Sequence, residues 1–322
     1  MNILITGGCG FIGSNLAEYH LAKGDTVYVM DNLSTGSLKN VAGFQNNPNF
    51  EFEEADILNW PNINKITGWA HRIYHLAAII GVRKVLEDPL QVLETNIGGC
   101  AILLKTIAQN KSSAQVIIAS SSSVYGYREK DLLNEDDYLG IGPAHHQPAG
   151  YAISKMADEA YGVAYAQKFH IPVILLRFFN TIGARQTGRY GMVVPRFVEQ
   201  ACTNQPITIY GDGTQTRSFC DVRDVIVAIN KLAEKAPGQG DVFNVGNAHE
   251  LCINDLANLV KERAQSHSEL VHLPFQKVYG ENYFEIKQRR PDLSKLYQST
   301  QFKAQIPLEK TIDDLIAIFR SR

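Results

Sequence analysis

Tyrosine followed four positions later by lysine is the pattern with the clearest chemical use in this 322-residue chain. Two residues four apart lie on one face of a helix. A tyrosine phenol titrates at about pH 10, and a neighbouring ammonium favours its phenolate. The phenolate can take a proton from an alcohol while hydride leaves the same carbon. The pattern occurs at Tyr19 and Lys23, Tyr151 and Lys155, and Tyr283 and Lys287.

Position in the chain separates these three pairs. Only Tyr151 and Lys155 begin an expected helix after a strand that ends in a serine cluster, residues 120–123. Ligands of parallel sheets bind beyond the carboxyl ends of the strands. A serine hydroxyl there can donate a hydrogen bond to a developing ketone. We therefore predict that Tyr151 is a base and Lys155 its partner, the alternative being an aromatic on a helix surface.

A glycine-rich turn near the N-terminus predicts a dinucleotide site. An apolar strand at residues 2–6 is followed by Gly-x-Gly-x-x-Gly, with glycines at 8, 10 and 13, and then by a helical pattern. These glycines allow a tight turn, close approach to a pyrophosphate, and packing of helix on strand. Asp31 follows the second strand, where a carboxylate binds the adenosine ribose and repels a 2′-phosphate. The next basic residue is Lys39, so NAD is favoured over NADP.

Alternating strands and helices predict the fold class. Apolar strands are expected at residues 2–6, 26–30, 50–54, 71–76, 116–119 and 172–177, with long helices at 89–110 and 150–169. This order is typical of an α/β fold, here a Rossmann-type doubly wound parallel sheet with a smaller C-terminal α/β substrate lobe. We expect residues 1–180, with 218–248 returning to them, to form the dinucleotide-binding domain. Residues 181–217 and 249–322 would form the substrate lobe.

Composition excludes several classes of protein. The chain is 45% hydrophobic and 20% charged with a net charge of −2, which is too apolar for a disordered chain and gives no reason to expect nucleic acid or a membrane surface as partner. No stretch is apolar enough to span a bilayer and no secretory signal is evident, so we expect a cytoplasmic protein. The five cysteines are scattered, and His71 and His75 have no evident third ligand, so we expect neither disulfides nor a metal.

Several motifs in order carry a family resemblance. They are TGGCGFIGSN, DNLSTG, Asp56, HLAA, SSSSVYG, YAISK, RFFN and YGDGTQTRSF, followed more weakly by RRPDLSK at 289–295. Together they resemble the extended short-chain dehydrogenase/reductase family, and in particular its UDP-sugar 4-epimerases. The resemblance implies tightly bound NAD, a UDP-sugar substrate, a transient 4-keto sugar, and a homodimer formed through the helices at 89–110 and 150–169.

The resemblance also implies residue roles. The pyrophosphate would be held by Gly7, Gly10, Phe11, Ile12 and Gly13, and the adenosine ribose by Asp31 and Asn32. Adenine would meet Asp56 and Ile57, and the cofactor would be lined by Leu76, Ala77 and Ala78. Ser121, Tyr151 and Lys155 match the catalytic set, and Tyr151 and Lys155 would also contact the cofactor. The substrate would be bound by Ser122 and Ser123, and its diphosphate would be held by Asn180, Arg217 and Arg290. For Arg217 an ion pair with Asp221 or Asp224 is the alternative.

Departures from related families bear on the reaction. Sugar-nucleotide dehydratases resemble this chain but carry Asp-Glu after the catalytic serine or threonine, and UDP-glucuronate decarboxylases carry Glu before Val-Tyr-Gly; here Ser122 and Ser123 stand there. The substitutions favour an epimerase, acting first on UDP-glucose or else on UDP-glucuronate, whose carboxylate Arg83, Arg185 or Arg189 could meet. A dehydratase or decarboxylase that uses another acid, and a non-catalytic NAD-binding regulator, remain as alternatives.

Overall fold

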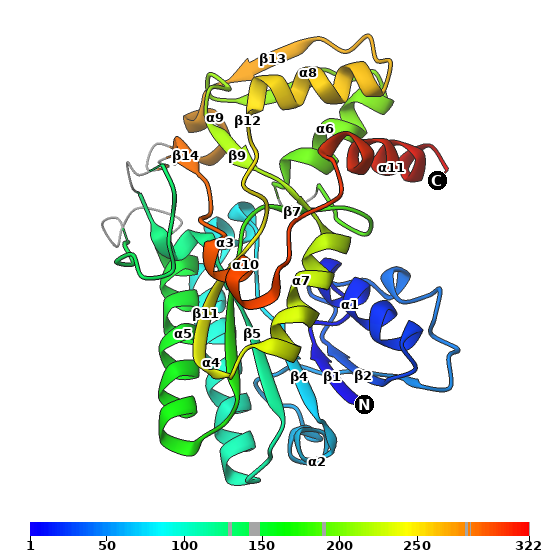
Figure 1. Ribbon diagram of the computed structural model, residues 1–322. Coiled ribbons are helices and arrows are strands. Elements are labelled where there is room, and N and C mark those ends of the chain that lie inside the picture. Colours follow the sequence, from blue (N-terminus) through cyan, green and yellow to red (C-terminus); the bar gives the residue numbers. More distant parts are fainter. Residues whose placement is uncertain (128–130, 142–148, 189–190, 281–282, 284, 322) are drawn as a thin grey trace.

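A parallel seven-stranded sheet forms the centre of the part of the chain that this computed structural model describes, residues 1–127, 131–141, 149–188, 191–280, 283 and 285–321 (Figure 1). Its order is β3-β2-β1-β4-β5-β6-β11, with every neighbouring pair parallel. The strands are β1 (Asn2–Thr6), β2 (Thr26–Asp31), β3 (Phe50–Glu54), β4 (Arg72–His75), β5 (Gln115–Ser121), β6 (Val173–Phe178) and β11 (Gln239–Val245). Parallel strands direct all their carboxyl ends to one edge, where the chain can build a binding site.

Helices cover both faces of this sheet, and each side has its own apolar core. One side carries α2 (Ile63–Trp69), α4 (Pro89–Gln109) and α5 (Ala149–Phe169), and the other carries α1 (Phe11–Ala22), α7 (Val222–Lys235) and α10 (Ser294–Thr300). The central strands β1, β5 and β6 are therefore mostly apolar, because both of their faces are buried, whereas the edge strand β3 alternates phenylalanine with glutamate. This confirms the expected Rossmann-type fold class. No helix among the described residues has the length and apolar character needed to cross a membrane.

Local signals in the sequence explain where key helices begin. Asp88 caps α4, since its side chain accepts a hydrogen bond from the backbone of Gln91 at 3.0 Å, and Pro89 opens the helix. Asp221 caps α7 in the same way. On the other side of the sheet, α5 is held by Arg177 of β6, which donates two hydrogen bonds of 2.8 Å to the carboxylate of Glu159. This buried pair fixes α5, and with it Tyr151 and Lys155, against the strand ends.

A second lobe lies above the carboxyl edge of the sheet in Figure 1, built from short strands and helices. Its helices are α6 (Val193–Cys202), α8 (Ile253–Arg263), α9 (Phe275–Tyr279) and α11 (Leu308–Arg320). Its strands pair as β10 (Cys220–Asp221) with β7 (Thr181–Ile182), as β12 (Glu250–Cys252), β9 (Thr216–Ser218) and β14 (Gln288–Arg289), and as β13 (Leu270–Leu273) with β8 (Ile207–Tyr210). A third apolar cluster fills this lobe.

Some elements differ from the prediction. The short helices α2 and α3 (Val82–Glu87), the 3₁₀ turns η1 (Leu38–Asn40) and η2 (Ser122–Tyr125), and most of the lobe strands were not predicted, because segments of two to seven residues carry too few positions to show a period. The segment around α10 also differs, since Leu296 and Phe302 pack in the core of α1, α7 and the sheet. In the domain division that we propose, residues 294–302 therefore go with the sheet.

Candidate functional site

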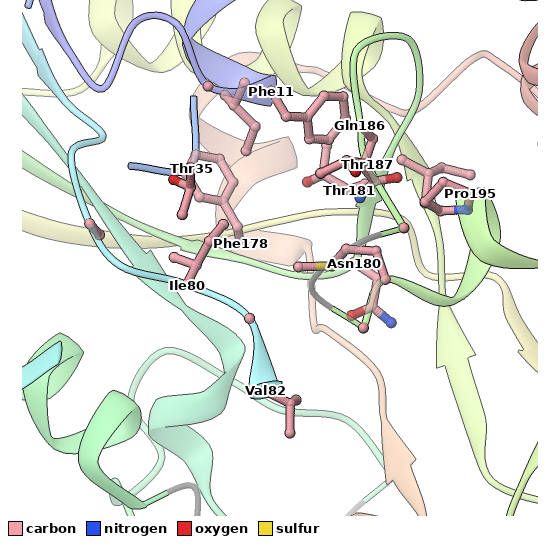
Figure 2. Close-up of a pocket in the computed structure, with 18 of the residues that line it drawn as sticks. Phe11, Thr35, Ile80, Val82, Phe178, Asn180, Thr181, Gln186, Thr187 and Pro195 are labelled. Carbon is pink, nitrogen blue, oxygen red and sulfur yellow. The ribbon is translucent and has the colours of Figure 1, made fainter. Parts of the chain in front are cut away.

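One continuous cavity of about 1520 Å³ runs along the carboxyl edge of the sheet and into the second lobe. Figure 2 shows part of its lining, with Phe11 and Phe178 on the sheet side and Asn180, Thr181 and Pro195 on the side of the lobe. Ligand pockets commonly hold about 300–1,000 Å³. The volume therefore suits two ligands placed end to end.

The glycine turn between β1 and α1 closes one end of this cavity. Gly7 has a φ of +73°, and a Cβ there would stand 2.7 Å from the backbone nitrogen of Ala77. A Cβ on Gly13 would lie 2.4 Å from the carbonyl oxygen of Gly7, so only glycine lets the turn and helix approach this closely. The residues predicted for the pyrophosphate and for the cofactor lining border the cavity here: Gly7, Gly10, Phe11, Ile12, Gly13, Leu76, Ala77 and Ala78.

Asp31 lies at the end of β2, where its carboxylate braces the glycine turn. It accepts hydrogen bonds from the backbone N–H groups of Cys9 at 2.9 Å and Leu33 at 2.8 Å. Burial raises the pKa of Asp31, although these backbone donors oppose the rise. Asn32 and Ile57 also line the cavity. Asp56 does not, because its carboxylate accepts from the side chain of Asn32 at 3.0 Å and from the backbone of Leu58.

The predicted catalytic residues come together at the middle of the cavity. Ser121 ends β5, Tyr151 and Lys155 lie in the first turns of α5, and all three line the cavity together with Ser123. Tyr151 packs on the apolar cluster of Ile79, Val85 and Val92. Ser122, also predicted to contact the substrate, is buried and does not line the cavity. It lies in the 3₁₀ turn η2, where successive side chains point about 120° apart.

Lys155 is buried, and its charge is balanced within the protein. Its side chain is 3% exposed, and Nζ donates to Oδ2 of Asp158 at 2.9 Å. Burial opposes the ammonium form, but attraction by Asp158 and Tyr151 outweighs burial, so the pKa of Lys155 is raised. The pKa of His75, at the end of β4, is shifted in the opposite direction to that of Lys155. Burial, and after it the charge of Lys155, lowers the pKa of His75 to about 3.

Asn96 of α4 is a positioning residue that the sequence analysis missed. Its amide donates to the Ser154 hydroxyl at 3.1 Å and to the carbonyl of Ile79, and its oxygen accepts from the Ile79 backbone at 2.8 Å. Asn96 thereby ties the loop after β4 to the helix that carries Tyr151. The available signal was a polar residue on the buried, otherwise apolar face of the helix at 89–110.

Two arginines meet at the lobe end of the cavity. Arg217 of β9 and Arg289 of β14 are register partners, and both line the cavity. Arg217 forms an ion pair with Glu285, so the alternative pairing with Asp221 or Asp224 is wrong. Burial, and after it repulsion by Arg217, lowers the pKa of Arg289 to about 10.

Arg290 was predicted beside Arg217, but the structure brings its neighbour Arg289 to this position instead. Its Nε donates to the carbonyl of Ala248 at 2.9 Å, and the side chain does not line the cavity. Strand β14 ends at Arg289, so Arg290 lies just beyond the pairing that directs Arg289 to the cavity. Asn180, predicted beside the arginines, does line it (Figure 2).

Of the three arginines predicted to meet a sugar carboxylate, the structure describes the side chain of Arg185 only. Arg185 borders the cavity, but it pairs with Glu18 of α1 at 2.6 Å and lies over the ring of Phe44, at the glycine-turn end. Arg185 therefore lies at the opposite end of the cavity from Arg217. Arg189 lies outside the described residues, as does the side chain of Arg83 in α3.

The sequence analysis also missed a group of aromatic side chains that line the lobe end of the cavity, formed by Tyr210, Tyr279 and Tyr283. The guanidinium carbon of Arg196 lies 3.7 Å from the ring centre of Tyr210, and Tyr279 meets Tyr210 edge-on at 5.6 Å. Tyr283 stacks near Tyr279 at 4.4 Å. All four border the cavity, although they come from three separate segments. The sequence offers no spacing that links them, because only the tertiary fold brings them together.

These features fit a dinucleotide at the glycine-turn end. The glycines leave no room for side chains, the N-terminus of the 12-residue helix α1 presents free backbone N–H groups, and the carboxylate of Asp31 borders the ribose position. Among the described residues, no cluster of three or more His, Cys, Asp or Glu side chains is arranged to hold a metal ion.

Comparison with known proteins agrees with this arrangement. Residues 3–246 match the model of the NAD dependent epimerase/dehydratase family. A UDP-N-acetyl-α-D-glucosaminuronate decarboxylase from Bacillus cytotoxicus is 35% identical over 319 residues, covering 98% of this chain and 97% of that protein. A UDP-glucuronic acid decarboxylase from Arabidopsis thaliana is 30% identical over 322 residues, which are 100% of this chain and 69% of that protein.

Solved structures of similar fold include two sugar epimerases. The UDP-glucose 4-epimerase of Thermotoga maritima, solved with UDP-glucose, superposes with a TM-score of 0.89 at 28% identity, covering 100% of this chain and 99% of that one. The UDP-glucuronic acid 4-epimerase of Bacillus cereus, solved with UDP-glucuronic acid and NAD, gives 0.88 at 29% identity with the same coverage. Both reaction types thus occur among proteins similar to this chain.

Proposed function

The chain belongs to the NAD-dependent epimerase/dehydratase family, and within this family we propose that it is a UDP-sugar 4-epimerase acting on UDP-glucose or UDP-glucuronate. One observation carries the proposal. Ser121, Tyr151 and Lys155 line a single cavity with the glycine turn, and the residue that faces this cavity beside them, Ser123, is a serine and not a carboxylate. Elimination of water from the sugar needs an acid and a base beyond the tyrosine, and this position supplies neither.

The residues of the chain have distinct roles in the proposed reaction. NAD, held by the glycine turn and Asp31, would supply the acceptor and donor of the C4 hydride. Tyr151 takes the proton of the 4-hydroxyl, and Ser121 donates a hydrogen bond to the carbonyl that develops there. Lys155 stabilises the phenolate by its positive charge, and it would also bind the cofactor beside Tyr151. Reversal of these steps on the other face of the 4-keto sugar inverts C4, with no net oxidation.

The arginine end of the cavity would hold the diphosphate while the sugar turns. Arg217 and Arg289 are adjacent guanidinium groups, which suit a diphosphate because each can donate two parallel hydrogen bonds. The aromatic rings of Tyr210 and Tyr279 lie beside them and offer flat surfaces to a nucleobase. In this proposal residues 1–180 and 218–248 bind NAD, and residues 181–217 and 249–322, apart from 294–302, bind the UDP-sugar.

Decarboxylation of a UDP-hexuronate is the second candidate. The relatives from Bacillus cytotoxicus and Arabidopsis thaliana, named as decarboxylases, match nearly the whole chain at 35% and 30% identity. Oxidation at C4 of a uronate gives a β-keto acid, which loses CO₂ readily, so the same Tyr151 and Lys155 would serve the first step. Glu285 is the carboxylate that lines the cavity nearest the arginines and would be the acid to examine.

Product analysis separates these candidates. Purified protein is incubated with UDP-glucose, UDP-glucuronate and their N-acetylated counterparts, and the products are resolved by chromatography and mass spectrometry. An epimerase gives a new peak of unchanged mass, whereas decarboxylation removes CO₂ and dehydration removes water. NAD binding without any turnover would instead favour a regulator.

The tyrosine assignment is tested with Tyr151→Phe. We expect turnover to fall by roughly two orders of magnitude or more, because general base catalysis commonly contributes about 10²–10⁴-fold. Tyr161→Phe on the same helix is the control, since Tyr161 is exposed and lies outside the cavity. Near-normal turnover of Tyr151→Phe would refute the assignment.

A further inference from the structure

A buried carboxylate lies directly behind the lysine of the site. Asp158 follows Lys155 by one turn of α5 and is fully buried, and its Oδ2 accepts from the Lys155 ammonium at 2.9 Å. Lys155 itself is 3% exposed, so water does not balance its charge. An unpaired ammonium at such a depth is strongly disfavoured, and a buried lysine without a counterion releases its proton.

We propose that Asp158 is a positioning residue that keeps Lys155 protonated and directed along α5 throughout the working pH range. Without the carboxylate the lysine would become a neutral amine, which neither stabilises a phenolate nor donates charge-assisted hydrogen bonds to the hydroxyl groups of a cofactor ribose. The inference rests on the assignment of Lys155 to the cofactor site in the proposed function, but not on the identity of the sugar.

The other charged or titratable groups near this pair do not replace Asp158. Tyr151 lies one turn before Lys155, but it is the proposed base and so cannot serve as a fixed counterion. Cys100 of α4 faces Asp158, and burial raises the pKa of its thiol well above the usual value, so it stays neutral. His75 of β4 is likewise neutral.

Glu159 is the remaining carboxylate on this part of α5, and it has other partners. It receives both hydrogen bonds of Arg177 and one from Ser120. Glu159 therefore anchors the helix to β5 and β6, whereas Asp158 contacts the lysine. This difference makes Glu159 a matched control, since it is adjacent in sequence, also buried, and also ion-paired.

The test measures the affinity of cofactor-free protein for NADH by fluorescence titration at several pH values between about 7 and 10. An ordinary lysine, with a pKa of about 10.4, stays mostly protonated over this range. For the wild type we expect a nearly constant affinity. For Asp158→Asn we expect the affinity to fall at least about tenfold across this range, since one unit of pH corresponds to a tenfold change in protonation. Asp158→Glu should restore the flat profile, and Glu159→Gln should lower the melting temperature with a flat profile.

The pH dependence of the melting temperature provides a second test, which applies even if Asp158→Asn is destabilised and binds NADH poorly. In folded Asp158→Asn, Lys155 should lose its proton at a lower pH than it does in the unfolded chain. The unfolded state then binds more protons than the folded state, so the melting temperature of this variant should rise with pH in this range. The melting temperature of the wild type should not rise. A flat NADH profile and an unchanged pH dependence of melting in Asp158→Asn would overturn the proposal. Neither readout needs turnover, so failure of the proposed epimerase activity would leave both interpretable.

Discussion

Glu285 is the residue that most directly controls the arginine end of the cavity. Its carboxylate pairs with Arg217 and also accepts from the Tyr283 hydroxyl at 2.8 Å, while the adjacent Arg289 stays close enough to repel Arg217. The carboxylate of Glu285 is therefore paired with one of these guanidinium groups and lies near enough to the other to attract it. A diphosphate would carry more negative charge to the same place, so Glu285 competes with it.

Glu285→Gln should therefore tighten the binding of UDP. We expect a gain of up to about fivefold, because partly exposed ion pairs contribute up to about 1 kcal/mol. Isothermal titration calorimetry with UDP measures it. Glu250→Gln is the control, since Glu250 bonds Thr216 and Gln288 on the same strands without lining the cavity. Weaker or unchanged binding in Glu285→Gln would show that Glu285 has a structural role only.

His75 predicts an acid-sensitive stability. Its pKa is lowered to about 3 by burial, so between about pH 6.5 and this value the unfolded state binds a proton that the folded state does not. Stability should then fall as the pH falls, by up to about 1.4 kcal/mol per unit from this group. Urea unfolding at several pH values measures the slope.

Comparison with two variants isolates this contribution. His75→Leu should have a shallower slope than the wild type, because it removes the buried imidazole. His71→Gln should keep the wild-type slope, since His71 is on the exposed end of the same strand region and accepts from the backbone of Asn2. Equal slopes in the wild type and His75→Leu would contradict the prediction.

At the scale of elements, α4 and α5 form a side-by-side pair on the outside of the sheet (Figure 1). A row of aromatic rings follows the outer part of α5, where Tyr161 and Tyr165 are 6.4 Å apart and Tyr165 stacks on Phe169 at 5.2 Å. Leu90 at the start of α4 is 70% exposed. Apolar groups gathered on an exposed helix pair often mark an interface. We propose that two copies of the chain associate through this pair.

Light scattering tests this association. The wild type should have the mass of a dimer, and Tyr161→Glu should shift it towards the monomer because a carboxylate would be buried at the interface. Val227→Glu, on the exposed surface of α7 across the sheet, should leave the mass unchanged. A monomeric wild type would contradict the proposal.

At the scale of the whole molecule, the sequence predicted the sheet and the glycine-turn end of the cavity well. These parts depend on local signals: period, caps, glycines and an acidic strand end, all within about 30 residues of one another. The middle of the cavity was also located, because Tyr151 and Ser121 each follow a strand of the sheet.

The lobe end was predicted less well, and the reason is physical. Arg289, Glu285, Arg196 and Tyr279 come together only through pairing of short strands that have no period of their own. The difference between Arg289 and Arg290 has the same origin, since Arg289 is placed by its register with β9 on a two-residue strand that the sequence does not signal.

The central claim is that C4 of a UDP-sugar loses and regains its hydrogen within this cavity. The most direct measurement uses UDP-glucose and UDP-glucuronate deuterated at C4, with the product examined by NMR and mass spectrometry. The account predicts a product of unchanged mass, inverted at C4, that retains deuterium on that carbon. Deuterium at another carbon, its loss to solvent, or a product that has lost CO₂ or water would contradict the account.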